Sequence, residues 1–281
     1  MYYRNMLFSL IFIVAALSTN LSVAVQPGSS VNTKHASDQE AKQDDASNED
    51  PLHLQRIEQL RKNIASEGYD ISSLLTDERF QLYENIDDFF TQSAERKSVD
   101  LQTYKRILGF KAKKRRGNVF LNEYKTMLEI AEAEYNISKF VIAAILGIES
   151  DFGKNVGSYN PFNTFVSMFA VDYRADFAKA QLLELLAFTQ RNQIDILELK
   201  SSYAGAVSFA QFIPYSLNKW FVGNDITSME NNIMSVANYL AYFEKRTKTL
   251  RTSILRYNPS GMYADAVLEL ANELEKSYGE S

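Results

Sequence analysis

Hydrophobic residues in four separate stretches of the chain recur every three or four positions, the spacing that places them on one face of an α-helix. No region shows several alternating strands bounded by turn residues, and only five prolines and eleven glycines occur in 281 residues. The pattern predicts an all-α domain over 51–281, with an N-terminal helical layer at 51–135 packed on a helical core at 136–281. The four stretches lie at 52–64, 121–135, 178–189 and 233–240.

The first fifty residues do not follow this pattern. Arg4 precedes an apolar run at 6–17, and small residues at 22–24 supply the pattern that a signal peptidase reads. Residues 1–24 therefore predict a cleaved secretory signal peptide. An uncleaved membrane anchor is the alternative, but the apolar run is short against the roughly 20 residues that span a bilayer. Residues 25–50 are polar and acidic, which predicts a disordered linker.

Composition narrows the possible chemistry. The chain has no cysteine and only two histidines, His35 and His53, both near its start. These counts argue against a cysteine nucleophile, a thiolate zinc site and a Ser-His-Asp triad. The net charge of -5 argues against a nucleic-acid partner, which normally requires a basic surface. A carboxylate is therefore the favoured proton-transfer group, with lysine or tyrosine as weaker candidates.

One carboxylate stands out by its position. Ser138 is a predicted N-cap, and the helix that follows it is apolar almost all round, so it should be buried. Glu149 falls in the last turn and shares a face with Ile145 and Leu146. Desolvation and the negative end of the helix dipole would both raise its pKa toward the value that a general acid needs. The alternative to a catalytic acid is that the Glu149 side chain leaves the helix end and pairs with a cation. Asp151 is interpreted as a surface or capping group.

Four stretches carry a more specific signal. They are GIESDFG (147–153), SYAGAVSFAQFIPYS (202–216), SVANYL (235–240) and LRYNPSGMYA (255–264). In order and approximate spacing they resemble the membrane-bound lytic transglycosylase B family, glycoside hydrolase family 103. The resemblance covers about 100–275 and includes a basic segment at 113–120 before the Glu149 helix.

The resemblance implies a lysozyme-like helical fold and an enzyme that acts on the glycan strands of peptidoglycan without a cofactor. The implied reaction splits the β-1,4 bond between N-acetylmuramic acid and N-acetylglucosamine and leaves a 1,6-anhydro end. Glu149 would be the single catalytic acid/base. The matching polar residues around the sugars are Ser202, Gln211, Tyr257 and Asn258, and the matching cleft aromatics are Tyr239 and Tyr263.

The chain departs from the family pattern in three places. Ser208 and Ala210 stand where the family usually has glycine or a similar small residue, so the added atoms could narrow the cleft or alter the backbone at Gln211. The region that carries a calcium loop in some members offers only Asp225 and Glu230, so no metal site is expected. No cysteine is available for a lipid anchor. We therefore expect a periplasmic monomer with no stable membrane anchor after signal cleavage.

Two alternatives remain open from the sequence. A muramidase of the same fold would need a second carboxylate, for which Asp172, Asp176 and Asp195 are candidates. A catalytically silent peptidoglycan-binding protein is the other alternative. The basic run at 111–116 is interpreted as a solvated face, and Trp220 as a packing residue.

Overall fold

A computed structural model describes residues 50–91 and 100–279. The predicted signal peptide and all but the last residue of the predicted linker lie outside the described residues, so both stay predictions. Over the described ranges the chain forms helices, with three isolated antiparallel β-bridges and no strand. The predicted all-α class is confirmed. No helix in this part of the chain is both long and apolar enough to cross a membrane.

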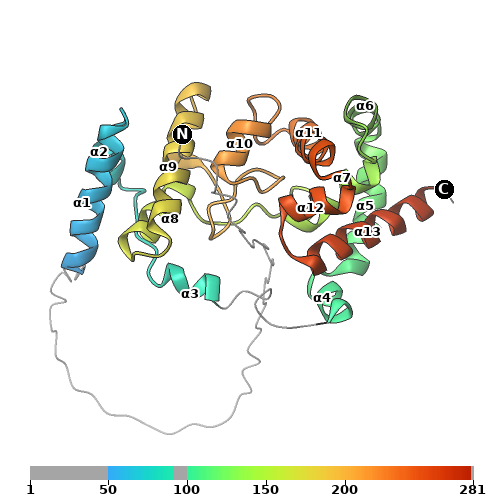
Figure 1. The fold of residues 1–281 in the computed structure, drawn as a ribbon, viewed down its shortest axis with the longest axis horizontal. Coiled ribbons are helices and arrows are strands. Elements are labelled where there is room, and N and C mark those ends of the chain that lie inside the picture. The colour runs from blue at the N-terminus through green and yellow to red at the C-terminus, as the bar shows by residue number, and fades with distance from the viewer. Residues whose placement is uncertain (1–49, 92–99, 280–281) are drawn as a thin grey trace, which may run out of the picture.

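The helices gather into two groups with a short helix between them (Figure 1). One group comprises α1 (Pro51–Ser66), α2 (Ser72–Leu75), α3 (Ile86–Thr91), α8 (Pro161–Ala170), α9 (Ala175–Asn192) and the 3-10 turn η1 (Ile196–Glu198). The other comprises α4 (Leu101–Ile107), α5 (Phe110–Glu123), α6 (Lys125–Tyr135), α7 (Lys139–Ser150), α11 (Met229–Thr247), α12 (Leu250–Tyr257) and α13 (Gly261–Gly279). Helix α10 (Pro214–Trp220) contacts α9 on one side and α11 on the other.

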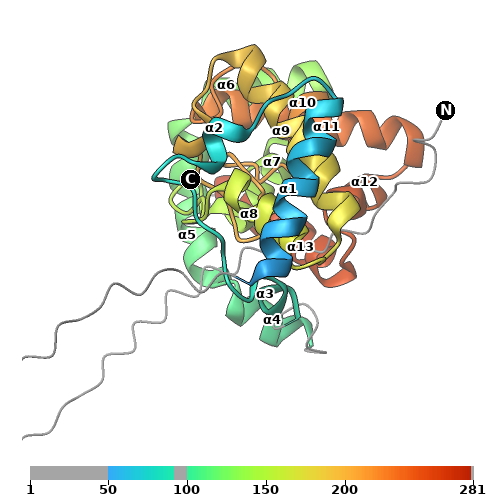
Figure 2. The ribbon, with the colours of Figure 1, turned by 90° about the vertical axis from the view of Figure 1, so that its left-hand side faces the viewer.

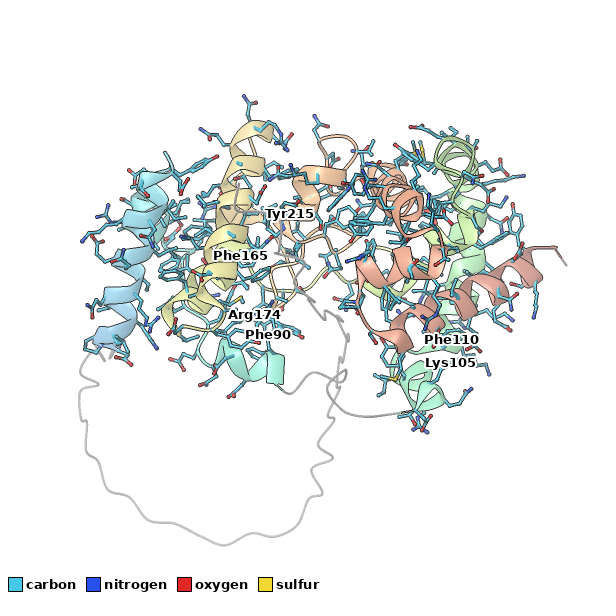
Figure 3. The ribbon with its side chains drawn as sticks, in the orientation of Figure 1. Phe90, Lys105, Phe110, Phe165, Arg174 and Tyr215 are labelled. Carbon is cyan, nitrogen blue, oxygen red and sulfur yellow. The ribbon has the colours of Figure 1, made fainter. Side chains whose placement is uncertain are left out.

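Helices before residue 136 pack on different partners. Figure 2 shows α1 lying across the first group, where it packs on α8 and α9. Helices α4, α5 and α6 instead pack on other helices of the second group. Lys105 of α4 lies over the ring of Phe110, with 4.6 Å from Nζ to the ring centre (Figure 3), and it also pairs with Glu269 of α13. Phe90 of α3 packs instead on Tyr173, which follows α8. The boundary between layer and core at 135/136 stays a prediction.

Most of the predicted helical stretches match observed helices, with two corrections. The stretch at 121–135 is divided between α5 and α6, because the chain leaves the helical conformation at Tyr124, with φ -104° and ψ 23°. In the stretch at 52–64, Leu60 and Ile64 are buried, but Leu52 and Leu54 are 52% and 48% exposed. The first turn of α1 therefore projects beyond the helices on which the rest of α1 packs.

Helix α7 forms the centre of the second group and packs against α5, α6, α11 and α13. Ser138 is its N-cap, with the hydroxyl accepting the N–H of Phe140 at 3.3 Å, and every residue from 140 to 150 is buried. The helix ends at Asp151, which adopts a left-handed conformation with φ 52°. The predicted cap, burial and helix end are all confirmed.

Two loops between the helix groups are joined by short backbone pairings. Bridges link Tyr159 to Ser201, Ser201 to Val207 and Val207 to Phe212. Gly157 allows the loops to approach closely, because a Cβ added there would lie 2.0 Å from the carbonyl oxygen of Ser201. Its φ of +91° also belongs to the region that glycine adopts most readily. These loops carry the second sequence motif to the end of α7.

Candidate active site

Glu149 lies in the last turn of α7 with 5% of its surface exposed. The hydroxyl of Tyr263, a fully buried residue of α13, donates a hydrogen bond to its Oε1 at 2.5 Å. The two residues are 114 positions apart in sequence and meet because α7 and α13 pack directly on each other. The structure thus joins the predicted acid to one of the predicted cleft aromatics.

Two further tyrosines line the same region. The hydroxyl of Tyr257, at the end of α12, donates to the carbonyl oxygen of Ala210, and its ring lies 4.9 Å from that of Tyr239 on α11. Burial raises the pKa of Tyr257 and of Tyr263 well above the usual value, and the charge of Glu149 acts in the same direction. Burial also raises the pKa of Tyr239. All three hydroxyls therefore stay neutral and serve as fixed hydrogen-bond donors near neutral pH.

The turn at 208–211 is conformationally strained. Ser208 has φ +68° and Gln211 has φ +51°, both in the left-handed region. The side-chain amide nitrogen of Gln211, Nε2, donates to the carbonyl oxygen of Ser208 at 2.9 Å. Ser208 Oγ and Gln211 Oε1 are buried without a hydrogen-bond partner among the described residues. Whether the side chains of Ser208 and Ala210 alter the backbone at Gln211 stays a prediction.

Two of the predicted polar residues brace loops. The hydroxyl of Ser202 accepts the backbone N–H of Ala206 at 3.2 Å, and Ser202 is 3% exposed. The side-chain oxygen of Asn258 accepts the N–H of Ser260 at 3.1 Å, which shapes the turn before α13. The Tyr239 hydroxyl is similarly engaged, since it donates to the carbonyl oxygen of Arg256. These hydrogen bonds hold loops and helix ends in place, and contact of the three side chains with a substrate stays a prediction.

Two buried residues near Glu149 and Tyr263 were not identified from the sequence. Lys113 of α5 lies within the run interpreted as a solvated face, yet it is only 7% exposed, and its Nζ donates to the carbonyl oxygen of Gly147 at 2.7 Å. Lys111 and Arg115 of the same run are exposed. Tyr104 of α4 is 1% exposed and interacts electrostatically with Tyr263. A helical repeat that counts Lys113 with Phe120 and Leu121 would have indicated that the lysine is buried.

Two of the candidate second carboxylates are paired with arginines far from α7 in the fold. Asp172 pairs with Arg56 at 2.8 Å, and Asp195 pairs with Arg79 at 2.8 Å. Within the ranges that the structure describes, no group of three or more His, Cys, Asp or Glu side chains is arranged to hold a metal ion.

Trp220 is 9% exposed and packs its ring 4.8 Å from that of Tyr239, as expected of a packing residue.

In fold and site, this is an all-α protein with a buried acid at the end of its central helix. The chain matches the transglycosylase SLT domain family over residues 53–250, and it belongs to that family. This membership confirms the predicted family and, together with the structural likeness below, the lysozyme-like fold.

A sequence relative is the membrane-bound lytic murein transglycosylase B of Escherichia coli K12, which is 27% identical over 132 residues. That alignment covers 46% of this chain and 37% of the relative, so this chain matches little more than a third of that protein. The soluble lytic transglycosylase SltB1 of Pseudomonas aeruginosa has a similar structure, with a TM-score of 0.71 and 25% identity over 80% of this chain and 99% of that one. SltB3 of the same organism, solved with NAG-NAM-pentapeptide, has a TM-score of 0.67 and 20% identity over 79% of each chain.

Proposed function

We propose that this protein is a lytic transglycosylase that cleaves the β-1,4 bond between N-acetylmuramic acid and N-acetylglucosamine and leaves 1,6-anhydromuramic acid ends. The observation that carries the proposal is the buried carboxyl of Glu149, held by the neutral hydroxyl of Tyr263 at the end of α7. Membership in the transglycosylase SLT domain family and the likeness to SltB1 support it.

One carboxyl suffices for this reaction because the substrate supplies the nucleophile. Ordinary glycosidases use two carboxyl groups, one as acid and one as nucleophile or base. Here Glu149 donates its proton to the glycosidic oxygen as the bond from that oxygen to the anomeric carbon breaks. The muramic 6-hydroxyl then forms a bond to the anomeric carbon, and its proton passes to the Glu149 carboxylate. The acid is thereby regenerated and no water is consumed.

Tyr263 has a defined part in this cycle. Between the two proton transfers Glu149 is an anion in a buried site, where an unsolvated charge is costly. The Tyr263 hydroxyl donates to that carboxylate and, being neutral, adds no competing negative charge. Because its hydroxyl bonds the carboxyl directly, we assign Tyr263 to holding Glu149 instead of stacking on a sugar.

The substrate is proposed to bind beside Glu149. We propose that Ser202, Gln211, Tyr257 and Asn258 bind the amino sugars, with Tyr239 supporting the Tyr257 ring. The unpartnered oxygen of Gln211 supports this assignment, since a buried acceptor gains most from a donor such as an N-acetyl N–H or a sugar hydroxyl. SltB3 was solved with a peptidoglycan fragment, which supports the same substrate class. We further propose a periplasmic monomer, exported by a cleaved signal peptide and without a stable membrane anchor.

The test is to incubate the purified protein with peptidoglycan and to analyse the products by mass spectrometry. Anhydro ends are expected. Reducing ends, heavier by one water, would instead identify a muramidase, and binding without products would identify a silent binding protein.

Variants of two glutamates complete the test. Glu149→Gln keeps the shape of the side chain, so we expect a folded protein whose turnover falls by about a thousandfold or more. The matched control is Glu275→Gln, because Glu275 is an exposed acid on α13. Circular dichroism establishes that both variants fold. Full activity in the Glu149 variant would refute the assignment of the acid.

A further inference from the structure

A buried lysine contacts the end of the helix that carries Glu149. Lys113 of α5 donates from Nζ to the carbonyl oxygen of Gly147 at 2.7 Å. The same ammonium lies 3.5 Å from Oδ1 of Asp151, which ends α7. Its two partners flank Glu149 in sequence, two residues before it and two after it. The positive charge is therefore placed at the last turn of α7.

Asp151 forms an ion pair with Lys113 and is itself bound by a second cation. Arg116, also on α5, donates from Nε to Oδ1 of Asp151 at 2.9 Å, and a terminal nitrogen of its guanidinium lies 2.7 Å from the same oxygen. Asp151 therefore bridges Arg116 and Lys113, and its left-handed backbone, with φ 52°, turns the side chain toward α5. An ammonium held by a carbonyl and a carboxylate in this way is retained in a buried site where an unpaired charge would not be.

The electrostatic consequence falls on Glu149. The unpaired carbonyls at a helix C-terminus carry partial negative charge, which disfavours a carboxylate in the last turn. Lys113 occupies one of those carbonyls and interacts attractively with the charge of Glu149. Burial lowers the pKa of Lys113, while the charges of Asp151 and Glu149 act in the opposite direction.

The other titratable groups that the described helices place around α7 are mainly neutral or anionic. From α13 and α12 come the neutral hydroxyls of Tyr263 and Tyr257, and from α11 the neutral Tyr239. Helix α6 contributes Glu132, which accepts the N–H of Lys139 at the opposite end of α7. On α5, Arg116 is held by Asp151, so its charge is balanced locally.

We propose that Lys113 is a positioning residue that offsets the negative end of α7 and thereby sets the proton affinity of Glu149 for its two successive roles. A carboxyl that is both buried and at a helix C-terminus binds its proton more tightly than a free carboxyl, and a nearby cation limits that effect. The ammonium restores acidity for the first transfer and stabilises the anion that awaits the second. This inference rests on the proposed function for its catalytic meaning, but the coupling of Lys113 to Glu149 is measurable without turnover.

The direct test is titration of the Glu149 side-chain carbon by ¹³C NMR in protein with labelled glutamate. The Glu149 signal is assigned by its loss in Glu149→Gln. In Lys113→Met, we expect the titration midpoint to rise by about one pH unit, because a nearby cation is removed. In Asp151→Asn, an anion is removed and Arg116 loses its partner, so the midpoint should fall. Lys114→Met is the matched control, because Lys114 pairs with Glu273 at the outer face of α5, at 2.6 Å.

Kinetics provide the second measurement. Because the first step needs protonated Glu149, the alkaline limb of kcat/KM should move to higher pH in Lys113→Met and to lower pH in Asp151→Asn. KM should change little, because Lys113 is buried and its ammonium is bound to the carbonyl oxygen of Gly147. A purely structural role would lower activity in both variants without opposite shifts. Asp151→Asn keeps the test decisive if Lys113→Met does not fold.

Two kinds of failure are distinguishable. An unchanged Glu149 midpoint in folded Lys113→Met, or in folded Asp151→Asn, would overturn the role of Lys113. If the wild-type protein releases no anhydro products, the proposed function fails, while the titration still decides whether Lys113 controls the proton affinity of Glu149.

Discussion

Two networks of charged side chains lie in different surroundings in the described structure. In the first, Lys113, Arg116 and Asp151 surround the end of α7 next to Glu149, and the lysine side chain is only 9% exposed. In the second, Arg79 bonds three acids, at 2.8 Å to Asp77, 2.8 Å to Asp195 and 3.0 Å to Glu198. The acids of this second network are 27%, 49% and 72% exposed.

The comparison shows that the number of ion pairs in a network does not indicate how strongly its charges affect stability or the site. Water screens the Arg79 network, so its pairs add little to stability despite good geometry. The network at α7 contains few pairs, but burial strengthens each interaction and makes each lost partner costly. Changes near α7 should therefore have large effects, and changes at Arg79 small ones.

The largest expected effect is at Gly157, in the loop that follows α7. Gly157→Ala should lower the free energy of unfolding by about 3 kcal/mol or more, because the methyl group would meet the Ser201 backbone and φ would be strained. Gly68→Ala is the control for backbone strain alone, since Gly68 has φ +92° with no atom within 4 Å of an added Cβ. We expect it to cost about 1 kcal/mol. Urea unfolding followed by circular dichroism measures both, and equal costs would show that the loops are not tightly joined.

The next effect concerns the hydroxyl that binds Glu149. Tyr263→Phe removes a hydrogen bond to a charged group, so kcat should fall by about 10- to 100-fold with the protein still folded. Tyr83→Phe is the matched control, because its hydroxyl accepts the N–H of Asn160 at 2.8 Å and is not part of the proposed site. The measurement is the rate of anhydro product formation across pH. Wild-type kcat in the Tyr263 variant would mean that this hydroxyl does not support the proton transfers.

Sequence predicted α7 well and its surroundings less well, for a physical reason. The cap at Ser138, the burial of the helix and the place of Glu149 depend on local pattern, and the structure confirms them. Lys113 was misjudged because its neighbours in sequence are mostly cations, whereas burial follows the helical repeat that it shares with Phe120 and Leu121. The packing of α1 on α8 was not predictable, because an apolar stripe shows that a helix packs but not on which partner.

Ser208 offers a smaller effect of opposite sign. Ser208→Gly should relieve the strain at φ +68° and remove a buried hydroxyl that has no partner among the described residues. After the entropy cost of glycine, we expect a gain of about 1 kcal/mol, or about 2 to 4 °C in Tm. Ala210→Gly is the control and should destabilise, because φ at Ala210 is not positive. Calorimetry decides, and a lower Tm in the Ser208 variant would contradict the strain.

Arg79→Met should give the smallest change, less than about 2 °C in Tm at neutral pH, because every pair it breaks is exposed to water. The effect has a defined pH dependence. Hydrogen bonds from Arg79 lower the pKa of Asp77 to about 2 and lower that of Asp195 as well. A depressed pKa stabilises the fold above the unfolded-state value, about 3.9, and that contribution is lost as pH falls through the folded value.

The Tm difference between wild type and Arg79→Met should therefore be constant from pH 5 to 8 and disappear between about pH 4 and 2. It should also shrink in 0.5 M salt, with activity on peptidoglycan unchanged, since none of these groups contacts α7. A decrease in Tm of more than about 5 °C in Arg79→Met that persists in high salt would show that the Arg79 network stabilises the fold as strongly as a buried network, contrary to the comparison.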